Sequence, residues 1–528
     1  MMAPMNRILL LLTGLTLSCS PKDAILLGPS PADTDTPSTQ TDSSTTPDSG
    51  RPQDTNDTDD TDDTDDTRVP KVLTVMIDGW KPEVIATAQT PTIDTLLSTA
   101  AYSLQTRVED TTISGSGQTT FLTGVHRDKH QVPDNSFSKP NTSDYPHHFT
   151  RIKSARPDLM TASYHTWSPV HASIVSDADI DAFAEYEDDG DAQMVSQLID
   201  DLSVAELDVI SLMLSDLDVV GHTYGFDASG SAYIAEMESI DGQIARVLAA
   251  VEARKTHESE RWLVVLSTDH AGTSYAHGEN ISEHRLVPLL VHGDGVAAGP
   301  IWPAPDAVDI VPTVLAHLGI EPEPTWGLDG RILGQEQTAP PDAALETNLI
   351  FNGDAEHERG YGDFTPDAAV PGWTDSGDAT VMLYGSADGF PTSSDPGPEE
   401  RGANFFCGGG TSDDTTLQQR IDLSALATDI AAGTTYDFSA HVGGYSSQDD
   451  RSQVMIAFVD SSGAALHTAT IGPLTASERS NTTGLWPVST TGTVPAAAVG
   501  VEVTINAIQS SGYNDGYADN LSLILRQE

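Results

Sequence analysis

The sequence predicts an α/β domain with a mostly parallel sheet between helices, followed by an antiparallel β-sandwich. In the first part of the chain, short apolar runs rich in β-branched residues alternate with helical patterns, as in parallel sheets covered on both faces. Beyond about residue 347, apolar and polar residues alternate with period two between Gly-, Ser-, Asp- and Thr-rich turns, which is typical of a sandwich. A chain of 528 residues is long enough for both domains.

The first residues have the layout of an export signal. In MMAPMNRILLLLTGLTLSCS a single Arg precedes an apolar run that is too short for a transmembrane helix. The run LTLSC resembles a bacterial lipobox, so we expect residues 1–19 to be a signal peptide and Cys19 to carry lipid. An ordinary signal peptide is the alternative. Cys407 is then the one cysteine that remains, so we expect no intramolecular disulfide.

Residues 20–69 are dominated by Asp, Thr, Ser and Pro, as in DTNDTDDTDDTDDT. Such a segment cannot bury enough apolar surface to offset the entropy of ordering, so we expect a disordered tether that spans roughly 35 to 40 Å. A calcium site in this repeat is disfavoured because the carboxylates lack a rigid loop. The net charge of −54 argues against binding a nucleic-acid duplex. The export signal and tether predict a lipoprotein held by its lipid at the outer membrane or cell surface.

Residues 70–338 are expected to form the α/β domain. Its clearest strands are the runs KVLTVMI, LDVISLML, WLVVLS and LVPLLV, at 71–77, 207–214, 262–267 and 286–291. A helix is predicted where apolar residues recur on one helical face, namely at Met237, Ile240, Ile244, Val247, Leu248 and Val251. Functional groups are expected at the carboxyl ends of the strands, which meet at one edge of a parallel sheet.

Carboxylates and histidines follow three of these strands. Asp78 follows the first, Asp218 and His222 follow the second, and Asp269 and His270 follow the third. Carboxylates and imidazoles that converge at one edge suit zinc, with manganese or iron as alternatives, and there are enough of them for two ions. Two neighbouring ions would clamp the attacking and leaving oxygens of an in-line displacement.

The stretch SGSGQTTFLTGVHRDKHQVPDN, residues 114–135, supplies a candidate nucleophile. A serine hydroxyl is a weak nucleophile at neutral pH, and coordination to a dication would lower its pKa. Glycines around Ser114 would let the backbone approach closely, and the following helix N-terminus would favour a bound anion. Ser116 competes for this role, and a surface turn is the alternative for the whole stretch.

In their order, these motifs resemble the alkaline phosphatase superfamily, and most closely its type I phosphodiesterase and nucleotide pyrophosphatase branch. The resemblance covers roughly residues 70–335 and rests on Asp78, the interval from Ser114 to Thr123-Gly124, His130, Asp134-Asn135, DVVGHTYG, STDHAG and VDIVPTVLAHLGIEPEPTWGLDGRIL. It implies an alkaline phosphatase-like fold and a phosphoester substrate.

The resemblance also implies roles for particular residues. Asp78, Asp269 and His270 would hold the ion that activates Ser114. Asp218, His222 and a third histidine would hold the other ion; His277 is the preferred third ligand, with His284 in reserve. Asn135 matches an amide that donates to a nonbridging phosphoryl oxygen, which stabilises charge in the transition state.

Several related activities compete with a phosphodiesterase. Monoesterases of this superfamily commonly place Arg, Lys or a third metal near the nucleophile. Here Arg127, Lys129 and Arg151 lie in segments expected to be surface loops, which favours a diester and leaves a phosphomonoesterase as the main alternative. A sulfatase is less favoured because Gln118 stands where the maturation motif has Arg. Export argues against a phosphomutase, and a non-catalytic surface binding lipoprotein is disfavoured because every inferred ligand is present.

Residues 347–528 resemble the galactose-binding-like jelly rolls that include many carbohydrate-binding modules. The resemblance rests on NLIFNGDAE, on PGW at Trp373 and on DGYADNLSLIL. It implies a structural calcium near both ends of the domain, at Glu356 and Asp519, whereas the alternative makes these residues and Asp354 parts of turns. A glycan or other cell-surface ligand is the implied partner class, although Trp373 also suits a core position.

Overall fold

The computed structural model describes residues 67–185, 189–334, 341–357, 359–364 and 370–527. The signal peptide, Cys19 and almost all of the expected tether therefore lie outside the described residues. Among the helices that are described, none combines the length and apolar character needed to cross a membrane.

The first domain is built on an eight-stranded sheet. Its strands are β1 (Val69–Ile77), β2 (Ala101–Arg107), β3 (Thr161–His165), β4 (Ile180–Phe183), β5 (Val209–Leu214), β6 (Glu260–Ser267), β7 (Leu286–Gly293) and β8 (Gly299–Pro300). They lie in the order β4-β3-β5-β1-β6-β7-β2-β8. β4, β3, β5, β1 and β6 are parallel, whereas β7 is antiparallel to both β6 and β2. The mostly parallel α/β fold is confirmed, with one strand of the predicted set reversed.

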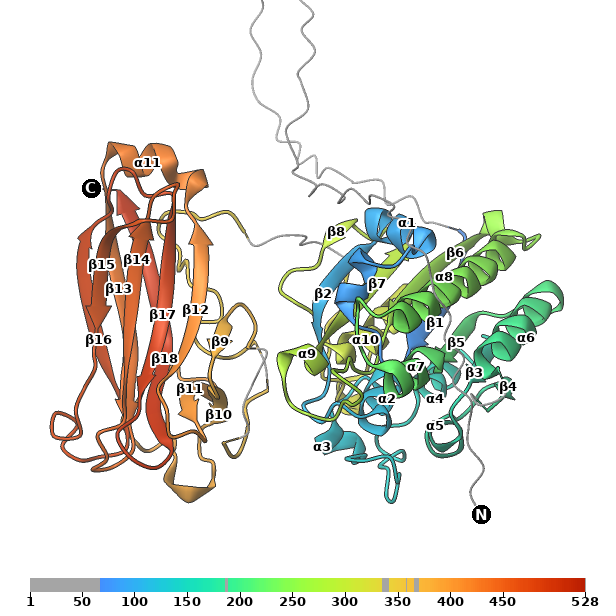
Figure 1. The fold of residues 1–528 in the computed structure, drawn as a ribbon, viewed down its shortest axis with the longest axis horizontal. Coiled ribbons are helices and arrows are strands. Elements are labelled where there is room, and N and C mark those ends of the chain that lie inside the picture. Colours follow the sequence, from blue (N-terminus) through green and yellow to red (C-terminus); the bar gives the residue numbers. More distant parts are fainter. Residues whose placement is uncertain (1–66, 186–188, 335–340, 358, 365–369, 528) are drawn as a thin grey trace, which may run out of the picture. The chain divides into compact units, whose positions relative to one another are not determined.

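Helices cover both faces of this sheet (Figure 1). They are α1 (Pro91–Thr99), α2 (Ser114–Thr123), α3 (Arg127–His130), α4 (His148–Ala155), α5 (Ser168–Ser173), α6 (Gly190–Val204), α7 (Asp216–Tyr224), α8 (Ser231–Glu252), α9 (Ser282–Arg285) and α10 (Ile310–His317). Short 3₁₀ helices lie at η1 (Pro82–Ala86), η3 (His257–Ser259), η4 (Ala307–Asp309) and η5 (Pro324–Trp326).

Alternate residues of β1 enter two different cores. Leu73, Val75 and Ile77 pack in a core that includes residues of α1, α6 and α8. Val72 and Met76 pack in a second core that includes residues of α2, α4 and α10. Because both faces of the strand are buried, its sequence is a continuous apolar run and not an alternating one.

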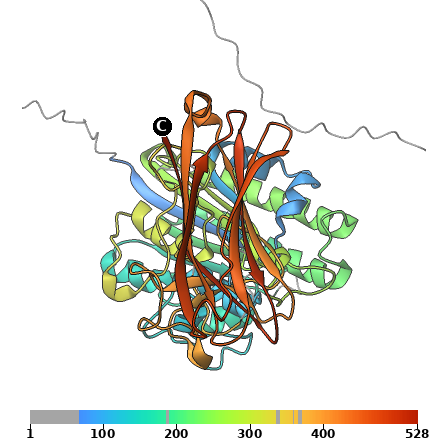
Figure 2. The same ribbon diagram turned by 90° about the vertical axis from the view of Figure 1, so that its left-hand side faces the viewer.

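The second domain consists of two five-stranded antiparallel sheets, seen in Figures 1 and 2. Its elements are β9 (Thr374–Ser376), β10 (Thr380–Leu383), η6 (Ala387–Gly389), β11 (Asn404–Gly409), β12 (Thr415–Asp422), η7 (Ser424–Leu426), α11 (Ala427–Ala432), β13 (Thr434–Gly444), β14 (Arg451–Val459), β15 (Ala465–Ile471), β16 (Gly484–Thr493), β17 (Gly500–Ile508) and β18 (Asn514–Gln527). The sheet orders are β10-β11-β18-β13-β16 and β15-β14-β17-β12-β9. Phe438 from one sheet and Ile456 and Val503 from the other share one core, which confirms the predicted sandwich.

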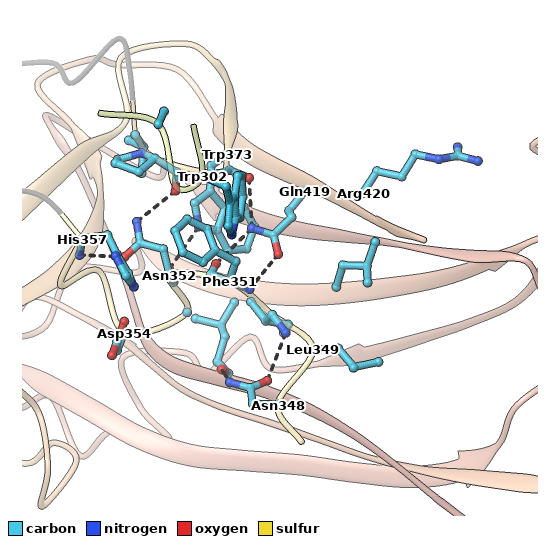
Figure 3. Close-up of a pocket in the computed structure, with 18 of the residues that line it drawn as sticks. Trp302, Asn348, Leu349, Phe351, Asn352, Asp354, His357, Trp373, Gln419 and Arg420 are labelled. Atoms are coloured by element: carbon cyan, nitrogen blue, oxygen red, sulfur yellow. Dashed lines mark hydrogen bonds between the residues drawn. The ribbon is translucent and has the colours of Figure 1, made fainter. Parts of the chain in front are cut away.

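Trp373 is part of the sandwich core. Its side chain is 7% exposed, and its ring centroid lies 5.6 Å from that of Phe406. Figure 3 shows the indole beside Asn352, whose backbone carbonyl oxygen accepts a hydrogen bond from the Trp373 Nε1–H at 3.1 Å. The core position is therefore the alternative that the structure shows, and Trp373 offers no exposed ring face for a sugar to stack on.

Candidate active site

Three loops bring the predicted metal ligands to one edge of the sheet. Asp78 directly follows β1, Asp218 lies in the first turn of α7 after β5, and Asp269 and His270 directly follow β6. β1 is the parallel neighbour of both β5 and β6, so the carboxyl ends of the three strands lie side by side. This placement is the one expected for functional groups on a parallel sheet.

Asp78, Asp269 and His270 form the first group of potential ligands. All three side chains are buried, and their ligand atoms lie within 4.8 Å of one another. The His270 Nε2 lies 3.5 Å from the Asp78 Oδ1 and 3.7 Å from the Asp269 Oδ2. The Ser114 Oγ lies 3.2 Å from the same His270 Nε2, so the candidate nucleophile adjoins this group.

Asp218, His222 and His277 form a second group that adjoins the first. The Asp218 Oδ2 lies 3.4 Å from the His222 Nε2, and its Oδ1 lies 3.7 Å from the His277 Nε2. The Nε2 atoms of His222 and His277 are 3.1 Å apart. His270 also belongs here, because it offers a ligand atom within 4.8 Å of those of Asp218 and His277. The two groups are therefore contiguous and share His270.

Each histidine of these groups is oriented by a backbone carbonyl. The Nδ1 atoms of His222, His270 and His277 lie 2.9, 3.2 and 2.7 Å from the carbonyl oxygens of Tyr275, Ala271 and Thr112. A carbonyl oxygen can only accept, so each Nδ1 carries a hydrogen, and in the neutral imidazole the lone pair is then on Nε2. Such contacts fix the tautomer that ligates a metal through Nε2.

His284, the reserve candidate, has other partners for both ring nitrogens. Its Nε2 lies 2.9 Å from the Thr273 Oγ1, and its Nδ1 accepts a hydrogen bond from the Glu279 backbone N–H at 3.2 Å. The geometry therefore favours His277 over His284 as the third ligand of the second group.

Burial disfavours the charged forms of the carboxylates and imidazoles in both groups. Burial, followed by the charges of Asp269 and Asp218, raises the pKa of Asp78 well above its usual value. Burial also raises the pKa of Asp218 to about 7 and raises that of Asp269. Burial lowers the pKa values of His270 and His277 to about 3, so both imidazoles are neutral at pH 7. A divalent cation would favour both the ionised carboxylates and the neutral imidazoles.

Unpaired buried oxygens support the same conclusion. The Oδ1 atoms of Asp78 and Asp218 are buried without a hydrogen-bond partner in the described part of the chain. In that part, the ion pairs of these two carboxylates involve histidines and neither Lys nor Arg. A buried carboxylate oxygen without a partner is costly. Carboxylate oxygens and imidazole Nε2 atoms are ligands of zinc, so these residues fit divalent ions.

Ser114 is the first residue of α2, and the N–H groups of a first helical turn have no carbonyl partner within the helix, which suits the start of a helix to binding an anion. The Gly115 N–H donates to the Asn135 Oδ1 at 2.8 Å, which orients the Asn135 amide so that its Nδ2 remains to donate. A Cβ on Gly117 would lie 2.4 Å from the Asp269 carbonyl oxygen. Glycine is therefore required for the close approach of α2 to the loop that carries Asp269.

The structure separates the two candidate serines. Ser116 is 0% exposed, and its Oγ has no hydrogen-bond partner among the described residues. Ser114 is 6% exposed and contacts the first ligand group. Ser116 is enclosed inside the domain, so the geometry favours Ser114 as nucleophile.

Basic side chains from the segment after Ser114 are engaged in other contacts. Arg127 lies on α3, Lys129 follows it there, and Arg151 lies on α4, so these segments are helices and not the surface loops that we expected. Arg127 and Lys129 form ion pairs with aspartates, whereas the Arg151 guanidinium lies 5.0 Å from the centre of an indole ring. Their partners are Asp110, Asp329 and Trp326.

Phe226, which no sequence motif indicated, packs among the loops that carry the ligands. Its side chain is 3% exposed. A Cβ on Gly79, Gly221 or Gly272 would lie 2.4 to 3.0 Å from its ring, and each of these glycines lies within two residues of a predicted ligand. The Phe226 ring also packs edge-to-face against the His222 ring, with the two ring centroids 5.4 Å apart. The glycines in DGW, VVGH and HAGT are the signal in the sequence, but they do not reveal which side chain fills the space.

The predicted calcium ligands make other contacts. The Glu356 Oε1 accepts hydrogen bonds from the N–H groups of Ala403 and Asn404 at 2.8 and 2.7 Å. The buried Asp519 Oδ2 accepts one from the Tyr384 hydroxyl at 2.7 Å, and burial raises the pKa of Asp519 to about 8. Among the described residues, Glu356 and Asp519 belong to no group of three acidic, His or Cys side chains close enough to share an ion. The calcium site stays a prediction.

The first domain has a mostly parallel sheet with buried Asp and His groups at its carboxyl edge, the arrangement expected of an alkaline phosphatase-like metalloenzyme. Residues 71–322 match the family model of the Metalloenzyme superfamily. The superfamily predicted for the first domain is thereby confirmed.

Individual relatives show more limited likeness. The chain is 35% identical over 112 residues to a phosphopentomutase of Methylobacterium radiotolerans, a match that covers 21% of this chain and 25% of that protein. A 2-O GAG sulfatase structure aligns with a TM-score of 0.42 and 13% identity, over 52% of this chain and 77% of the other. Murine ectonucleotide pyrophosphatase/phosphodiesterase 5, as an inactive variant with AMP, gives a TM-score of 0.41 and 12% identity, over 48% of this chain and 96% of the other. The match to the phosphopentomutase thus spans a quarter of the length of that protein.

Proposed function

We propose that the chain is an exported, metal-dependent phosphoric ester hydrolase of the phosphodiesterase or nucleotide pyrophosphatase type. The observation that carries this proposal is the position of the Ser114 Oγ, at the start of a helix and 3.2 Å from the His270 Nε2 that both ligand groups share. Two divalent ions, for which we propose zinc, would lower the pKa of the serine hydroxyl and offset charge on the phosphoryl oxygens. The proposed ligands are Asp78, Ser114, Asp269 and His270 for one ion, and Asp218, His222 and His277 for the other.

In this proposal Ser114 performs the displacement. Its Oγ loses its proton to solvent and forms a bond to phosphorus while the bond from phosphorus to one ester oxygen breaks; that oxygen takes up a proton and departs as an alcohol, and a serine phosphodiester remains. Water then attacks this intermediate at phosphorus, the bond to the Ser114 Oγ breaks and the oxygen regains a proton, and a phosphomonoester is released. The Asn135 Nδ2 and the Ser114 backbone N–H would donate to the nonbridging oxygens, where charge accumulates in the transition state.

The charge of the site favours a diester substrate. A phosphomonoester carries one more negative charge than a diester, and that charge calls for an additional cation near the nucleophile. Asn135 supplies a neutral donor, while Arg127, Lys129 and Arg151 are engaged with other partners. The donors in place match a phosphoryl group with a single negative charge.

We therefore expect a nitrophenyl phosphodiester to be cleaved with a kcat/KM at least tenfold above that of the matching monoester. A tenfold ratio corresponds to about 1.4 kcal/mol of differential transition-state stabilisation. The measurement compares diester, monoester and sulfate ester on one zinc-loaded preparation. A tenfold preference for the monoester would overturn the diester assignment and leave the two-metal serine mechanism in place.

A phosphomutase is the second candidate, because the curated relative that matches 112 residues of this chain is a phosphopentomutase. In a mutase the phosphoryl group would pass to a second hydroxyl of a sugar phosphate, and not to water. Phosphorus NMR of the enzyme with a pentose phosphate separates the two. We expect inorganic phosphate or no reaction, whereas an isomeric sugar phosphate would establish the mutase.

Anchoring through Cys19 is a separate part of the proposal, and it rests on the lipobox-like LTLSC and the acidic tether. We expect Cys19→Ala to move the protein from the membrane fraction to the soluble fraction, because the lipid would be its sole attachment. Cys407→Ala is the matched control: this thiol is buried, so its loss should leave the protein with the membranes. A Cys19→Ala protein that still fractionates with membranes would show that the anchor assignment is wrong. We further propose a glycan or another cell-surface ligand for the C-terminal domain.

A further inference from the structure

Gln118 is a buried polar residue that the proposed reaction does not use. It lies on α2 one helical turn after Ser114, so both side chains lie on the same face of the helix. Its side chain is 1% exposed. The Nε2 lies 2.7 Å from the Asp78 Oδ2 and 3.1 Å from the Asp269 Oδ2. One amide therefore bridges the two carboxylates of the first ligand group.

The contacts of the two carboxylates show what this amide contributes. Gln118 is the one side-chain donor to Asp78 in the described structure, and it holds Oδ2 while Oδ1 is left 3.5 Å from the His270 Nε2. The Asp269 Oδ1 already accepts from the Thr268 hydroxyl and the His270 N–H, each at 3.1 Å. Both carboxylates are thus held by donors, with Gln118 on the Oδ2 of each.

The chemistry of an amide suits this position. Its NH₂ group has two hydrogens for two acceptors, and it is neutral, so it can hold two carboxylates without competing with a bound cation. The Gln118 Oε1 is buried with no partner among the described residues. An unpaired buried carbonyl oxygen is costly, and an apolar side chain of similar size would avoid that cost. Packing alone therefore does not account for a glutamine here.

We propose that Gln118 is a positioning residue for the metal site formed by Asp78, Asp269 and His270. It fixes the rotation of both carboxylates, so that the ligand atoms are aligned before an ion binds. Hydrogen-bond partners of metal ligands commonly contribute 10- to 100-fold to metal affinity. The inference rests on the proposed function only in requiring that these residues bind a metal.

The test is zinc titration of the metal-free full-length protein in competition with a chromophoric chelator. We expect wild type to bind two ions and Gln118→Met, which keeps the volume but removes the donor, to bind one of them about 10- to 100-fold more weakly. Gln118→His restores one N–H donor in place of two, so it should bind this ion more tightly than Gln118→Met and less tightly than wild type. Ser116→Ala, a neighbouring buried substitution whose hydroxyl has no hydrogen-bond partner among the described residues, should titrate like wild type.

The outcomes separate this inference from the proposed function. If wild type binds zinc at neither site, the two-metal proposal fails. If wild type binds two ions and Gln118→Met binds both with unchanged affinity, the role of Gln118 is overturned while the metal site stands. Equal weakening by Gln118→Met and Gln118→His would also overturn it, because loss of the donor would then not be the cause. Gln118→Leu gives a second donor-free variant, to which the same criteria apply if Gln118→Met does not fold.

Discussion

Replacing Ser114 by alanine is expected to lower kcat/KM toward a phosphodiester by at least about 10³-fold, because the group that forms the covalent bond to phosphorus is lost. The carboxylate and imidazole ligands of both ions are unchanged in this variant, so both ions should still bind at saturating zinc, the ion that loses Ser114 more weakly than in wild type. Steady-state assays on zinc-loaded protein, together with metal content, measure the two quantities. Trapping of phosphorus on the wild-type chain but not on Ser114→Ala would identify the covalent intermediate directly.

Ser116→Ala is the matched control for this experiment. Ser116 lies two residues along the same helix and is 0% exposed, so a substrate cannot reach its hydroxyl in this structure. The variant should keep wild-type kcat/KM within about twofold. Retention of more than a tenth of the activity by Ser114→Ala, or an equal loss in Ser116→Ala, would contradict the assignment of the nucleophile.

The parts of the fold that could be predicted are those with strong patterns of burial. β1 and β5 are buried on both faces, and β13, β14 and β17 alternate over most of their lengths, so each leaves a clear pattern. β2 reads AYSLQTR, with the exposed residues Leu104 and Gln105 in its middle, and gives no such pattern. The reversed direction of β7 could not be predicted either, because an apolar run reports burial and carries no information on direction.

The site divides in the same way. Asp78, Asp218, Asp269 and His270 could be named because each follows an apolar strand, and parallel strands place their carboxyl ends together. Gln118 and Phe226 could not be assigned such roles, because their roles depend on side chains distant in sequence that only the folded chain brings together. The choice between His277 and His284 also needed the structure, since it depends on which ring nitrogens have other partners.

His270→Ala is expected to have the largest effect of any single ligand substitution. His270 is a proposed ligand of the ion that would activate Ser114, and its Nε2 also lies beside the second group, so its loss should release the first ion and disturb the second site. We expect metal content to fall from two ions per chain to one or less, and diester kcat/KM to fall by at least about 10³-fold, because a site that loses a ligand holds its ion weakly. Elemental analysis and kinetics on the same preparation measure both.

His284→Gln is the matched control, because His284 is also a buried histidine after β6 but both of its ring nitrogens have other partners. It should keep two ions and most of the activity.

Exhaustive treatment of wild type with a strong chelator should reproduce the loss seen in His270→Ala, and zinc should restore activity to wild type but not to the variant. Full activity in metal-free wild type would exclude the metal-dependent mechanism. Loss of ions in His284→Gln but not in His270→Ala would show that His284, and not His270, is the metal ligand. The two histidines are both buried and both follow β6, but of the two only His270 has its Nε2 within 3.7 Å of carboxylate oxygens of both Asp78 and Asp269. The two substitutions are therefore expected to differ in metal content.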